Sequence, residues 1–409
     1  MPGDKSVSHR SVMLGAIARG KTEIRNFLLA EDCLHTLKAF KALGIEGAFK
    51  GKDCIVLNGK GLQGLRRSKK AIYLGNSGTS MRLLSGILAG QPFATTLTGD
   101  PSLSQRPMRR VILPLEKMGA KIKAKKDEFP PLMIQGGSLK GIRYPIPIPS
   151  AQVKSAILLA GLYAEGKTTV TESFKTRDHT ERMLQEFGKS LALKGLTVSL
   201  AGCEELRGAR VEIPGDISSA AFFIVLASAL RGSQLIVKEI GLNPTRTGFL
   251  KVLQRMGAFI TLKEDDRGSR SGEPSGEIEI KGAPLHGTIV KASEIPALID
   301  ELPILMVAAS CAEGKTVFQE ASELRVKETD RIYSMVTNLR RMGVSIWNEK
   351  DDVVVEGGEP FHGAKVESFK DHRTAMSLTI AGCLAQKGRT TLHDIACIQT
   401  SFPGFINLI

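Results

Sequence analysis

Gly3-Asp4-Lys5-Ser6 leads into the apolar run Val12-Met13-Leu14-Gly15-Ala16-Ile17-Ala18, and together they form the first copy of a pattern that recurs along the chain. Each copy has a short polar motif, an apolar helix ending at glycine and a Thr-rich strand, and most copies add a second helix. The later copies open at Gly75-Asn76-Ser77-Gly78-Thr79, Ser150-Ala151-Gln152, Gly215-Asp216-Ile217-Ser218-Ser219, Asp300-Glu301 and Asp371-His372-Arg373. Six copies at a spacing of about 75 residues indicate one folding unit used six times.

The polar motifs are expected to lie on one side of the repeats, because equivalent positions in repeated units point in equivalent directions. A helix N-terminus carries about half a positive charge and has unpaired N–H groups. Several N-termini that face one space form a binding site for anions. The repeat therefore predicts a site for phosphate or carboxylate ligands.

Length and turn residues predict two domains. A chain of 409 residues exceeds the size of a single hydrophobic core. Pro2-Gly3-Asp4 and Pro214-Gly215-Asp216 open the two halves, and proline and glycine suit a segment that crosses between domains. We therefore expect a first domain at residues 3–213, a second at residues 214–409 and a hinge near residues 1–3 and 213–216, with three repeats in each domain.

Composition argues against nucleic-acid and membrane partners. The net charge is +14, with basic clusters at residues 66–70 and 121–126, but only 5% of residues are aromatic and no helix-turn-helix, zinc-finger or RNA-recognition signature is present. No apolar run reaches 18 residues and no signal peptide opens the chain, so a cytoplasmic protein is expected. The six cysteines lack Cys-x-x-Cys spacing, which predicts reduced structural thiols and no metal site. The charged stretch at residues 264–277 predicts a surface loop.

Two motifs in the first half carry candidate anion ligands. Lys5, Ser6 and Arg10 offer an ammonium, a hydroxyl and a guanidinium to one anion at a helix start. The alternative is that Ser6 or Ser8 caps the helix and that Lys5 is a surface charge, and the motif alone does not decide between them. The glycines of residues 74–82 let the backbone approach a ligand closely, but the segment is neither a Walker loop nor a dinucleotide-binding motif.

Acid and base candidates lie in the second half. Asp300 and Glu301 begin an apolar helix, and Arg325-Val326-Lys327-Glu328-Thr329-Asp330-Arg331 begins its partner. Asp371-His372-Arg373 adds an imidazole beside a guanidinium. Neighbouring cations lower the pKa of a carboxyl group and apolar burial raises it, so such groups can serve as acids or bases. A purely structural ion-pair network is the plainer interpretation, and both stay open on these residues alone.

Eight motifs in order carry a resemblance to a known family. They are Gly3-Asp4-Lys5-Ser6-Val7-Ser8-His9-Arg10, residues 75–82, Gln105-Arg106-Pro107-Met108, Ser150-Ala151-Gln152-Val153-Lys154, Asn243-Pro244-Thr245-Arg246, residues 324–331, Asp371-His372-Arg373 and Ser401-Phe402-Pro403. With these motifs the chain resembles the 5-enolpyruvylshikimate-3-phosphate (EPSP) synthases over almost its whole length. Residues 150–154, 177–181 and 243–246 are similar to the set that marks the group called class II.

The resemblance implies an α/β fold, specifically a two-domain inside-out α/β barrel built from six βαβαββ repeats, with the active site in the interdomain cleft. The implied reaction transfers the enolpyruvyl group of phosphoenolpyruvate to the 5-hydroxyl of shikimate 3-phosphate and releases phosphate, in the shikimate pathway to chorismate and aromatic amino acids. No cofactor and no metal are expected. The implied ligands are these two small-molecule substrates and the inhibitor glyphosate, and we expect a monomer.

The resemblance also implies a role for each site residue. Shikimate 3-phosphate would be held by Lys5, Ser6, Arg10, Ser150, Ala151, Gln152, Arg177, Asp300 and Lys327. Phosphoenolpyruvate would be held by Lys5, Asn76, Gly78, Thr79, Arg106, Gln152, Arg331 and Arg373. The implied catalytic residues are Asp300, Glu328 and Lys5, with Asp300 as base for the 5-hydroxyl and Glu328 at the C3 proton. Which of Asp300, Glu328, Lys5 and His372 moves which proton is left open.

Two departures and two alternatives accompany this resemblance. Ser102 and Thr400 stand where many family members have an arginine and a lysine, so Arg106 is expected to contact phosphate alone and the carboxylate side loses one cation. The sister enzyme that transfers the same group to UDP-N-acetylglucosamine usually has a cysteine in the loop corresponding to residues 100–106, and this loop has none. A basic RNA-binding repeat scaffold would explain the charge but not the site-like residues at every helix start.

Overall fold

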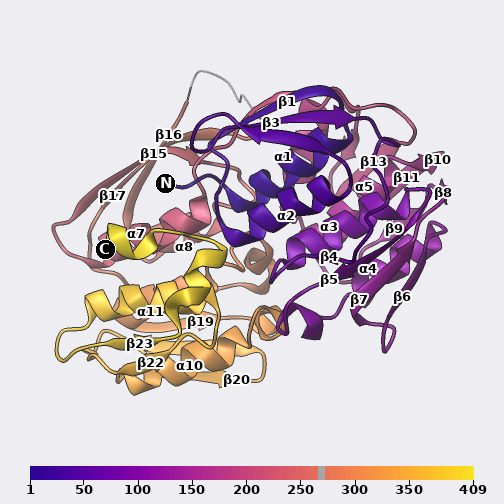
Figure 1. Cartoon of the computed structure of the whole chain (residues 1–409). Coiled ribbons are helices and arrows are strands. Elements are labelled where there is room, and N and C mark those ends of the chain that lie inside the picture. Colours follow the sequence, from indigo (N-terminus) through magenta and orange to yellow (C-terminus); the bar gives the residue numbers. More distant parts are fainter. Residues whose placement is uncertain (266–271) are drawn as a thin grey trace. The chain divides into compact units, whose positions relative to one another are not determined.

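A computed structural model describes residues 1–265 and 272–409 of the chain (Figure 1). By internal contacts these residues form two compact units. The first unit comprises residues 3–213 and 272–273, and the second comprises residues 1–2, 214–265 and 274–409. Each unit has its own hydrophobic core.

The first unit contains three repeats. The first has α1 (Lys5–Ile17), β1 (Arg19–Arg25), α2 (Glu31–Ala42), β2 (Glu46–Phe49) and β3 (Ile55–Lys60). The second has β4 (Ile72–Tyr73), α3 (Gly78–Ala89), β5 (Ala94–Thr98), α4 (Arg109–Lys117), β6 (Lys121–Lys125) and β7 (Phe129–Gln135). The third has β9 (Arg143–Pro145), α5 (Ala151–Gly161), β11 (Lys167–Thr171), α6 (His179–Glu186), β12 (Ala192–Lys194) and β13 (Thr197–Ala201). The short strands β8 (Leu139–Lys140), β10 (Ala164–Glu165) and β14 (Arg210–Glu212) complete the unit.

The three repeats build sheets of the same design. The strand orders are β14-β1-β3-β2, β4-β5-β7-β6 and β12-β13-β11-β9. In each sheet one outer strand pairs in parallel with its neighbour and the other pairs are antiparallel. This is the pattern of a βαβ crossover followed by a helix and a hairpin. In the first repeat the parallel partner of β1 is β14, which comes from the end of the unit rather than from its beginning.

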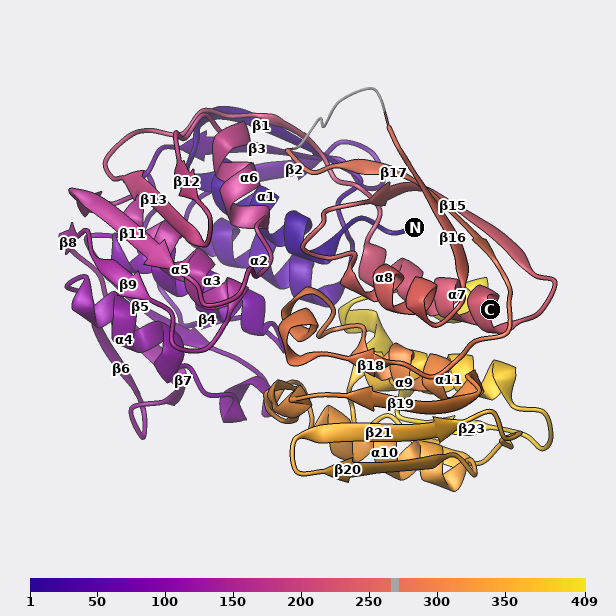
Figure 2. The ribbon, with the colours of Figure 1, turned by 180° about the vertical axis from the view of Figure 1, so that it is seen from behind.

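The second unit repeats the design with a shorter last copy. Its first repeat has α7 (Ile217–Ala229), β15 (Gln234–Gly241), α8 (Gly248–Arg255), β16 (Phe259–Glu264) and β17 (Ser275–Lys281). The next has β18 (Ile289–Val290), α9 (Leu302–Cys311), β19 (Gly314–Phe318), α10 (Arg331–Arg341), β20 (Ser345–Glu349) and β21 (Asp352–Gly357). The last has β22 (Lys365–Glu367), α11 (His372–Leu384) and β23 (Thr391–His393), followed by 3-10 turns at Ile395–Thr400 and Phe405–Leu408. Helices α7 and α8 pack on the β15-β17-β16 sheet, as the view from behind shows (Figure 2).

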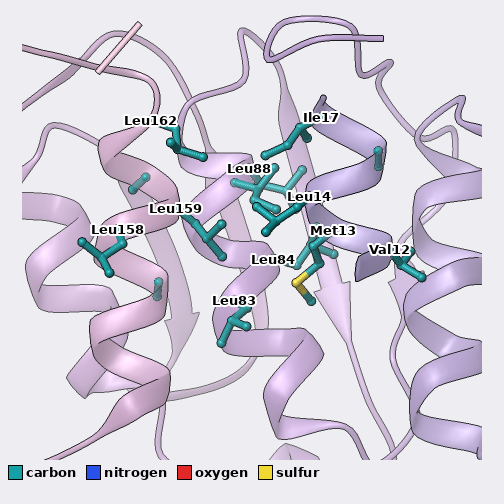
Figure 3. Close-up of a cluster of buried hydrophobic side chains, with 14 of the residues drawn as sticks. Val12, Met13, Leu14, Ile17, Leu83, Leu84, Leu88, Leu158, Leu159 and Leu162 are labelled. Atoms are coloured by element: carbon teal, nitrogen blue, oxygen red, sulfur yellow. The ribbon is translucent and has the colours of Figure 1, made fainter. Parts of the chain in front are cut away.

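The first helix of each repeat is buried on nearly all sides, because it lies among other helices and a sheet. In the first unit, α3 packs against both α1 and α5, and leucines of the three helices lie together in the core (Figure 3). Helices α3 and α5 lie close together at Gly86, where a Cβ atom would lie 2.2 Å from the carbonyl oxygen of Ala156. A helix that is apolar all round is stable only when buried in this way. The helix starts are thereby fixed side by side within the unit.

The expectation of a surface loop at residues 264–277 is wrong for its last part. Residues 266–271 lie outside the described part of the chain. Beyond them, Glu273 is only 3% exposed and accepts a hydrogen bond of 2.7 Å from Nδ1 of buried His179, while Glu277 lies in β17. Composition alone did not predict the burial of Glu273, because its partner His179 is 94 residues away in the chain and a glutamate among Gly, Ser and charged residues is typical of a surface loop. Among residues 1–265 and 272–409, no helix is both long and apolar enough to span a bilayer.

Candidate active site

The polar motifs act first as helix caps. Asp4 Oδ1 accepts from the Val7 N–H at 2.9 Å, and the caps of α3, α5, α7 and α11 are made in the same way by Ser77, Ser150, Asp216 and Asp371. Each cap satisfies one of the free N–H groups of the first turn. The alternative in which Ser6 or Ser8 caps α1 is therefore wrong: Asp4 is the cap, and Ser8 Oγ accepts from the Leu28 N–H at 3.2 Å.

Lys5 and Arg10 extend from α1 and are held by partners far along the chain. Lys5 Nζ lies 2.6 Å from Asp32 Oδ2. Arg10 Nε donates to Thr180 Oγ1 at 2.7 Å and Nη2 donates to Ser155 Oγ at 3.0 Å. Burial lowers the pKa of Arg10 to about 10, so its guanidinium remains charged at neutral pH. Both side chains are cations in fixed positions, as an anion site requires.

The Arg177 side chain belongs to the same cationic neighbourhood. Burial is the main cause of the lowered pKa of Arg10, and the positive charge of Arg177 lowers it further. The carboxylates of Glu181, Asp4 and Glu273 oppose this shift. Ser6 is half-buried, and its carbonyl oxygen accepts from Arg10 Nη1 at 2.9 Å. Ser150 and Ala151 form the cap and the first residue of α5.

A second set of ligands surrounds the start of α3. Arg82 Nη1 donates to Gln152 Oε1 at 2.6 Å, and Gln152 Nε2 donates to Thr79 Oγ1 at 3.0 Å. Arg106 Nη2 donates to Asn76 Oδ1 and, at 3.3 Å, to Ser102 Oγ. A Cβ atom at Gly78 would lie 2.9 Å from Arg82 Nη1 and 3.2 Å from Arg106 Nη1. The predicted residues Asn76, Gly78, Thr79, Arg106 and Gln152 therefore lie together, and Arg82 is added to them.

In the second unit, Arg331 gathers three carboxylates. Its Nε lies 3.0 Å from Asp371 Oδ2, its Nη1 lies 3.3 Å from Asp300 Oδ1 and its Nη2 lies 2.6 Å from Glu328 Oε2. Burial alone would lower the pKa of Arg331, but the three carboxylates together raise it above its ordinary value. The two predicted acid–base residues, Asp300 and Glu328, thus lie beside each other on one guanidinium.

Arg373 and Lys327 complete the cluster around Asp300 in the second unit. Arg373 Nη1 donates to the backbone oxygen of Asp300 at 3.0 Å, and Nη2 lies 3.5 Å from Asp300 Oδ2. Burial lowers the pKa of Lys327, and the nearby Asp300 carboxylate opposes this shift. His372 is buried, and its Nδ1 lies 3.4 Å from Thr400 Oγ1. A threonine thus occupies the position where the resemblance predicted a lysine.

The sequence did not predict the contacts by which several residues hold the site. Asp32 pairs with Lys5, and Asp371 both caps α11 and pairs with Arg331. Fully buried Lys154 lies 2.8 Å from Glu172 Oε2 and 2.7 Å from Glu181 Oε1, next to the segment that carries Arg177. No local signal pairs these positions, because they are 18 to 40 residues apart in the chain. Among the described residues, no group of His, Cys, Asp and Glu side chains is arranged to hold a metal ion.

A family model described as EPSP synthase (3-phosphoshikimate 1-carboxyvinyltransferase) matches residues 1–409. The chain belongs to the EPSP synthase family. It is 50% identical over 412 residues to a 3-phosphoshikimate 1-carboxyvinyltransferase of Desulforamulus reducens, covering 100% of this chain and 95% of the relative. It is likewise 50% identical over 411 residues to the enzyme of the same name from Thermodesulfovibrio yellowstonii, with the same coverage.

Solved EPSP synthase structures have the same fold. A structure of the enzyme from Acinetobacter baumannii superimposes with a TM-score of 0.87 at 47% sequence identity, covering 100% of this chain and 93% of that chain. A second structure from that organism gives a TM-score of 0.86 at 46% identity, with the same coverage. The resemblance inferred from the sequence and the α/β fold of EPSP synthases are thereby confirmed.

Proposed function

We propose that this chain transfers the enolpyruvyl group of phosphoenolpyruvate to the 5-hydroxyl of shikimate 3-phosphate and releases phosphate. The observation that carries the proposal is the pair Asp300 and Glu328 on the single guanidinium of Arg331, in a chain of the EPSP synthase family. Addition followed by elimination needs one group that takes the hydroxyl proton and another that gives and retrieves a proton at C3.

The first unit supplies cations for the anionic groups of the substrates. Its candidate ligands are Lys5, Arg10, Arg82, Arg106 and Arg177. Arg10 and Arg177, with the start of α5, suit shikimate 3-phosphate, and Arg106 with the start of α3 suits the phosphate of phosphoenolpyruvate. Lys5 is assigned to both substrates, where its ammonium offsets the charge that develops on the departing phosphate.

The second unit supplies the groups that move protons. Asp300 takes the proton of the 5-hydroxyl as the oxygen bonds to C2 of phosphoenolpyruvate, and C3 gains a proton from the protonated form of Glu328. The C2–O bond to phosphate then breaks, a proton at C3 returns to Glu328, and the phosphate leaves as hydrogen phosphate with the proton that Asp300 had taken. Because Arg331 is already bound to three carboxylates, the substrate carboxylate competes with Glu328 for its Nη2. This competition releases Glu328 for proton transfer, and Arg373 provides the second contact.

Phosphate release is the direct test. We expect inorganic phosphate to appear only when shikimate 3-phosphate and phosphoenolpyruvate are both present, and the product to carry an enolpyruvyl ether. Phosphate release that depends on UDP-N-acetylglucosamine instead would refute the proposal in favour of the sister enzyme. No turnover with either acceptor, together with retention on RNA at physiological salt, would favour the RNA-binding alternative. The family match supports the EPSP synthase assignment over both.

Location and assembly belong to the same proposal. We infer a monomeric cytoplasmic enzyme, since the substrates are small charged molecules and the described residues contain no bilayer-spanning helix. Light scattering coupled to size exclusion measures the mass directly. A mass near 44.1 kDa is expected for the monomer, and twice that mass would contradict it.

A further inference from the structure

Glu301 stands at the N-cap position of α9 but does not cap the helix. The equivalent residues of α1, α3, α5, α7 and α11 each accept a backbone N–H of their own first turn, whereas the Glu301 side chain makes no such bond. Its carboxylate is 0% exposed. Oε1 accepts a hydrogen bond from Ser218 Oγ, and no donor among the described residues reaches Oε2.

A buried line of polar groups connects Glu301 to two arginines. On one side, Arg246 Nη2 donates to Ser218 Oγ at 2.6 Å and lies 3.3 Å from Asp216 Oδ1. The Ser218 hydroxyl therefore accepts from Arg246 and donates to Glu301. On the other side, Glu301 Oε1 lies 3.7 Å from Arg373 Nη1, in ion-pair range but beyond hydrogen-bond distance.

Stability alone does not account for this carboxylate. A buried acceptor without a donor costs about 1–3 kcal/mol. Replacing a buried ionic cluster by well-packed apolar side chains is often neutral or stabilising. A buried glutamate that neither caps its helix nor has a hydrogen-bond donor for both oxygens lowers the stability of the fold. Its position 3.7 Å from Arg373 Nη1 indicates that it acts on this guanidinium instead.

Arg373 has a second carboxylate within reach. Its Nη2 is 3.5 Å from Asp300 Oδ2, the oxygen of the proposed base, while its Nη1 is bonded to the backbone of the same residue. A guanidinium that closed onto Asp300 through two parallel hydrogen bonds would lose N–H groups needed for a substrate anion. The charge of Glu301 attracts the guanidinium at Nη1, away from the Nη2 that lies nearest to the Asp300 carboxylate, and its distance of 3.7 Å leaves the N–H groups of Nη1 without a hydrogen bond to Glu301.

We propose that Glu301, held by Ser218 and Arg246, is a positioning residue that keeps Arg373 oriented toward the carboxylate of phosphoenolpyruvate. The inference rests on the proposed function. It also assigns a role to the Asn243–Arg246 motif, because Arg246 offsets the charge of Glu301 and orients the hydroxyl of Ser218. Loss of Glu301 should weaken phosphoenolpyruvate binding and leave shikimate 3-phosphate binding unchanged.

The test is steady-state phosphate release by the full chain carrying Glu301→Gln, which keeps the shape and removes the charge. We expect KM for phosphoenolpyruvate to rise about tenfold, the loss of roughly one interaction of 1.4 kcal/mol, with KM for shikimate 3-phosphate within about twofold. The matched control is Glu294→Gln, a carboxylate that pairs with Arg255 on the surface of the same unit, and its constants should equal those of the natural chain.

The outcomes separate three cases. If Glu301 has only a structural role, Glu301→Gln will lower the melting temperature and kcat and leave KM for phosphoenolpyruvate unchanged. This result would overturn the inference. If Glu301→Gln does not fold, Ser218→Ala provides the second test, since it removes the hydroxyl that holds Oε1. An unchanged KM in a folded Ser218→Ala variant also overturns it. Failure of the proposed function is recognised separately, because the natural chain itself would then release no phosphate.

Discussion

Substitution of Gly78 by alanine tests the proposed role of the start of α3 in binding phosphoenolpyruvate. The backbone of Gly78 does not adopt a positive φ, so alanine fits its conformation. The added methyl carbon would lie 2.9 Å from Arg82 Nη1 and 3.2 Å from Arg106 Nη1. Both atoms are tips of flexible side chains, so they can retreat without a shift of the backbone. The substitution therefore perturbs two cations and leaves the helix intact.

The size of the effect follows from these distances. The Arg82 nitrogen has to move by about 0.5 Å to reach ordinary contact with carbon. Forcing a long side chain off its preferred rotamer costs about 0.5–1.5 kcal/mol. We expect KM for phosphoenolpyruvate to rise by up to about tenfold, since 1.4 kcal/mol corresponds to that factor. Inhibition by glyphosate, a longer molecule that we expect in the same site, should weaken more than substrate binding does.

Phosphate release at varied phosphoenolpyruvate and glyphosate concentrations measures both effects. Glyphosate should compete with phosphoenolpyruvate in the natural chain. Gly137→Ala is the matched control, because a Cβ at Gly137 meets nothing within 4 Å and its backbone φ is also not positive. Equal weakening of both ligands by Gly78→Ala would refute the steric argument. Insensitivity of the natural chain would direct attention to Ser102 and Thr400, which lack the expected cations.

Three further predictions concern single groups. Glu328→Gln should lower kcat by a factor of about a hundred to ten thousand, while calorimetry finds unchanged shikimate 3-phosphate affinity; more than half of the natural activity would contradict its role. Lys154→Met leaves Glu172 and Glu181 buried without their cation, so urea unfolding should show a loss of about 3–5 kcal/mol; an unchanged midpoint would contradict this. His9→Asn should reduce the loss of stability on acidification, measured by urea midpoints at pH 7 and pH 5.

The sign of the His9 effect follows from its burial. The imidazole is 0% exposed, and burial, aided by the charges of Lys5 and Arg10, lowers its pKa well below the ordinary value. The unfolded chain therefore takes up the proton first, at a pKa of about 6.5. Stability is complete above that pH and is lost as pH falls toward the folded-state pKa, by about 1.4 kcal/mol per unit. Parallel stability curves for the natural chain and His9→Asn would contradict this assignment.

The repeat predicted most of the fold because it encodes local geometry. A polar cap, an apolar helix and a glycine stop are short-range signals, and they located the starts of α1, α3, α5, α7 and α11 within about two residues. The shorter last copy, with 3-10 turns after β23, has no comparable signal. The parallel partner of β1 was also unpredictable from local pattern, since β14 lies at the far end of the unit.

Without the family resemblance, the residues themselves predicted the candidate site only as a set of charged helix starts. The sequence does not distinguish an aspartate that caps a helix from one that forms an ion pair or accepts a proton. Asp4 caps, Asp371 caps and also binds Arg331, and Glu301 does not cap at all. Tertiary contacts decide among these uses, and they join positions such as residues 5 and 32 that no periodicity relates.

The charges of the two halves are divided in a way that suits the chemistry. Residues 3–213 contain 34 Lys and Arg against 18 Asp and Glu, whereas residues 214–409 contain 22 against 24. The substrates together carry two phosphates and two carboxylates, which require many cations. A carboxylate surrounded by many cations has a strongly lowered pKa and becomes a poor base. Asp300 and Glu328 share the guanidinium of Arg331 with Asp371, so three carboxylates face this one cation in a half whose Lys and Arg do not outnumber its Asp and Glu. In the proposed reaction, the first unit therefore supplies most of the cations for the substrate anions, and the second unit supplies the groups that transfer protons.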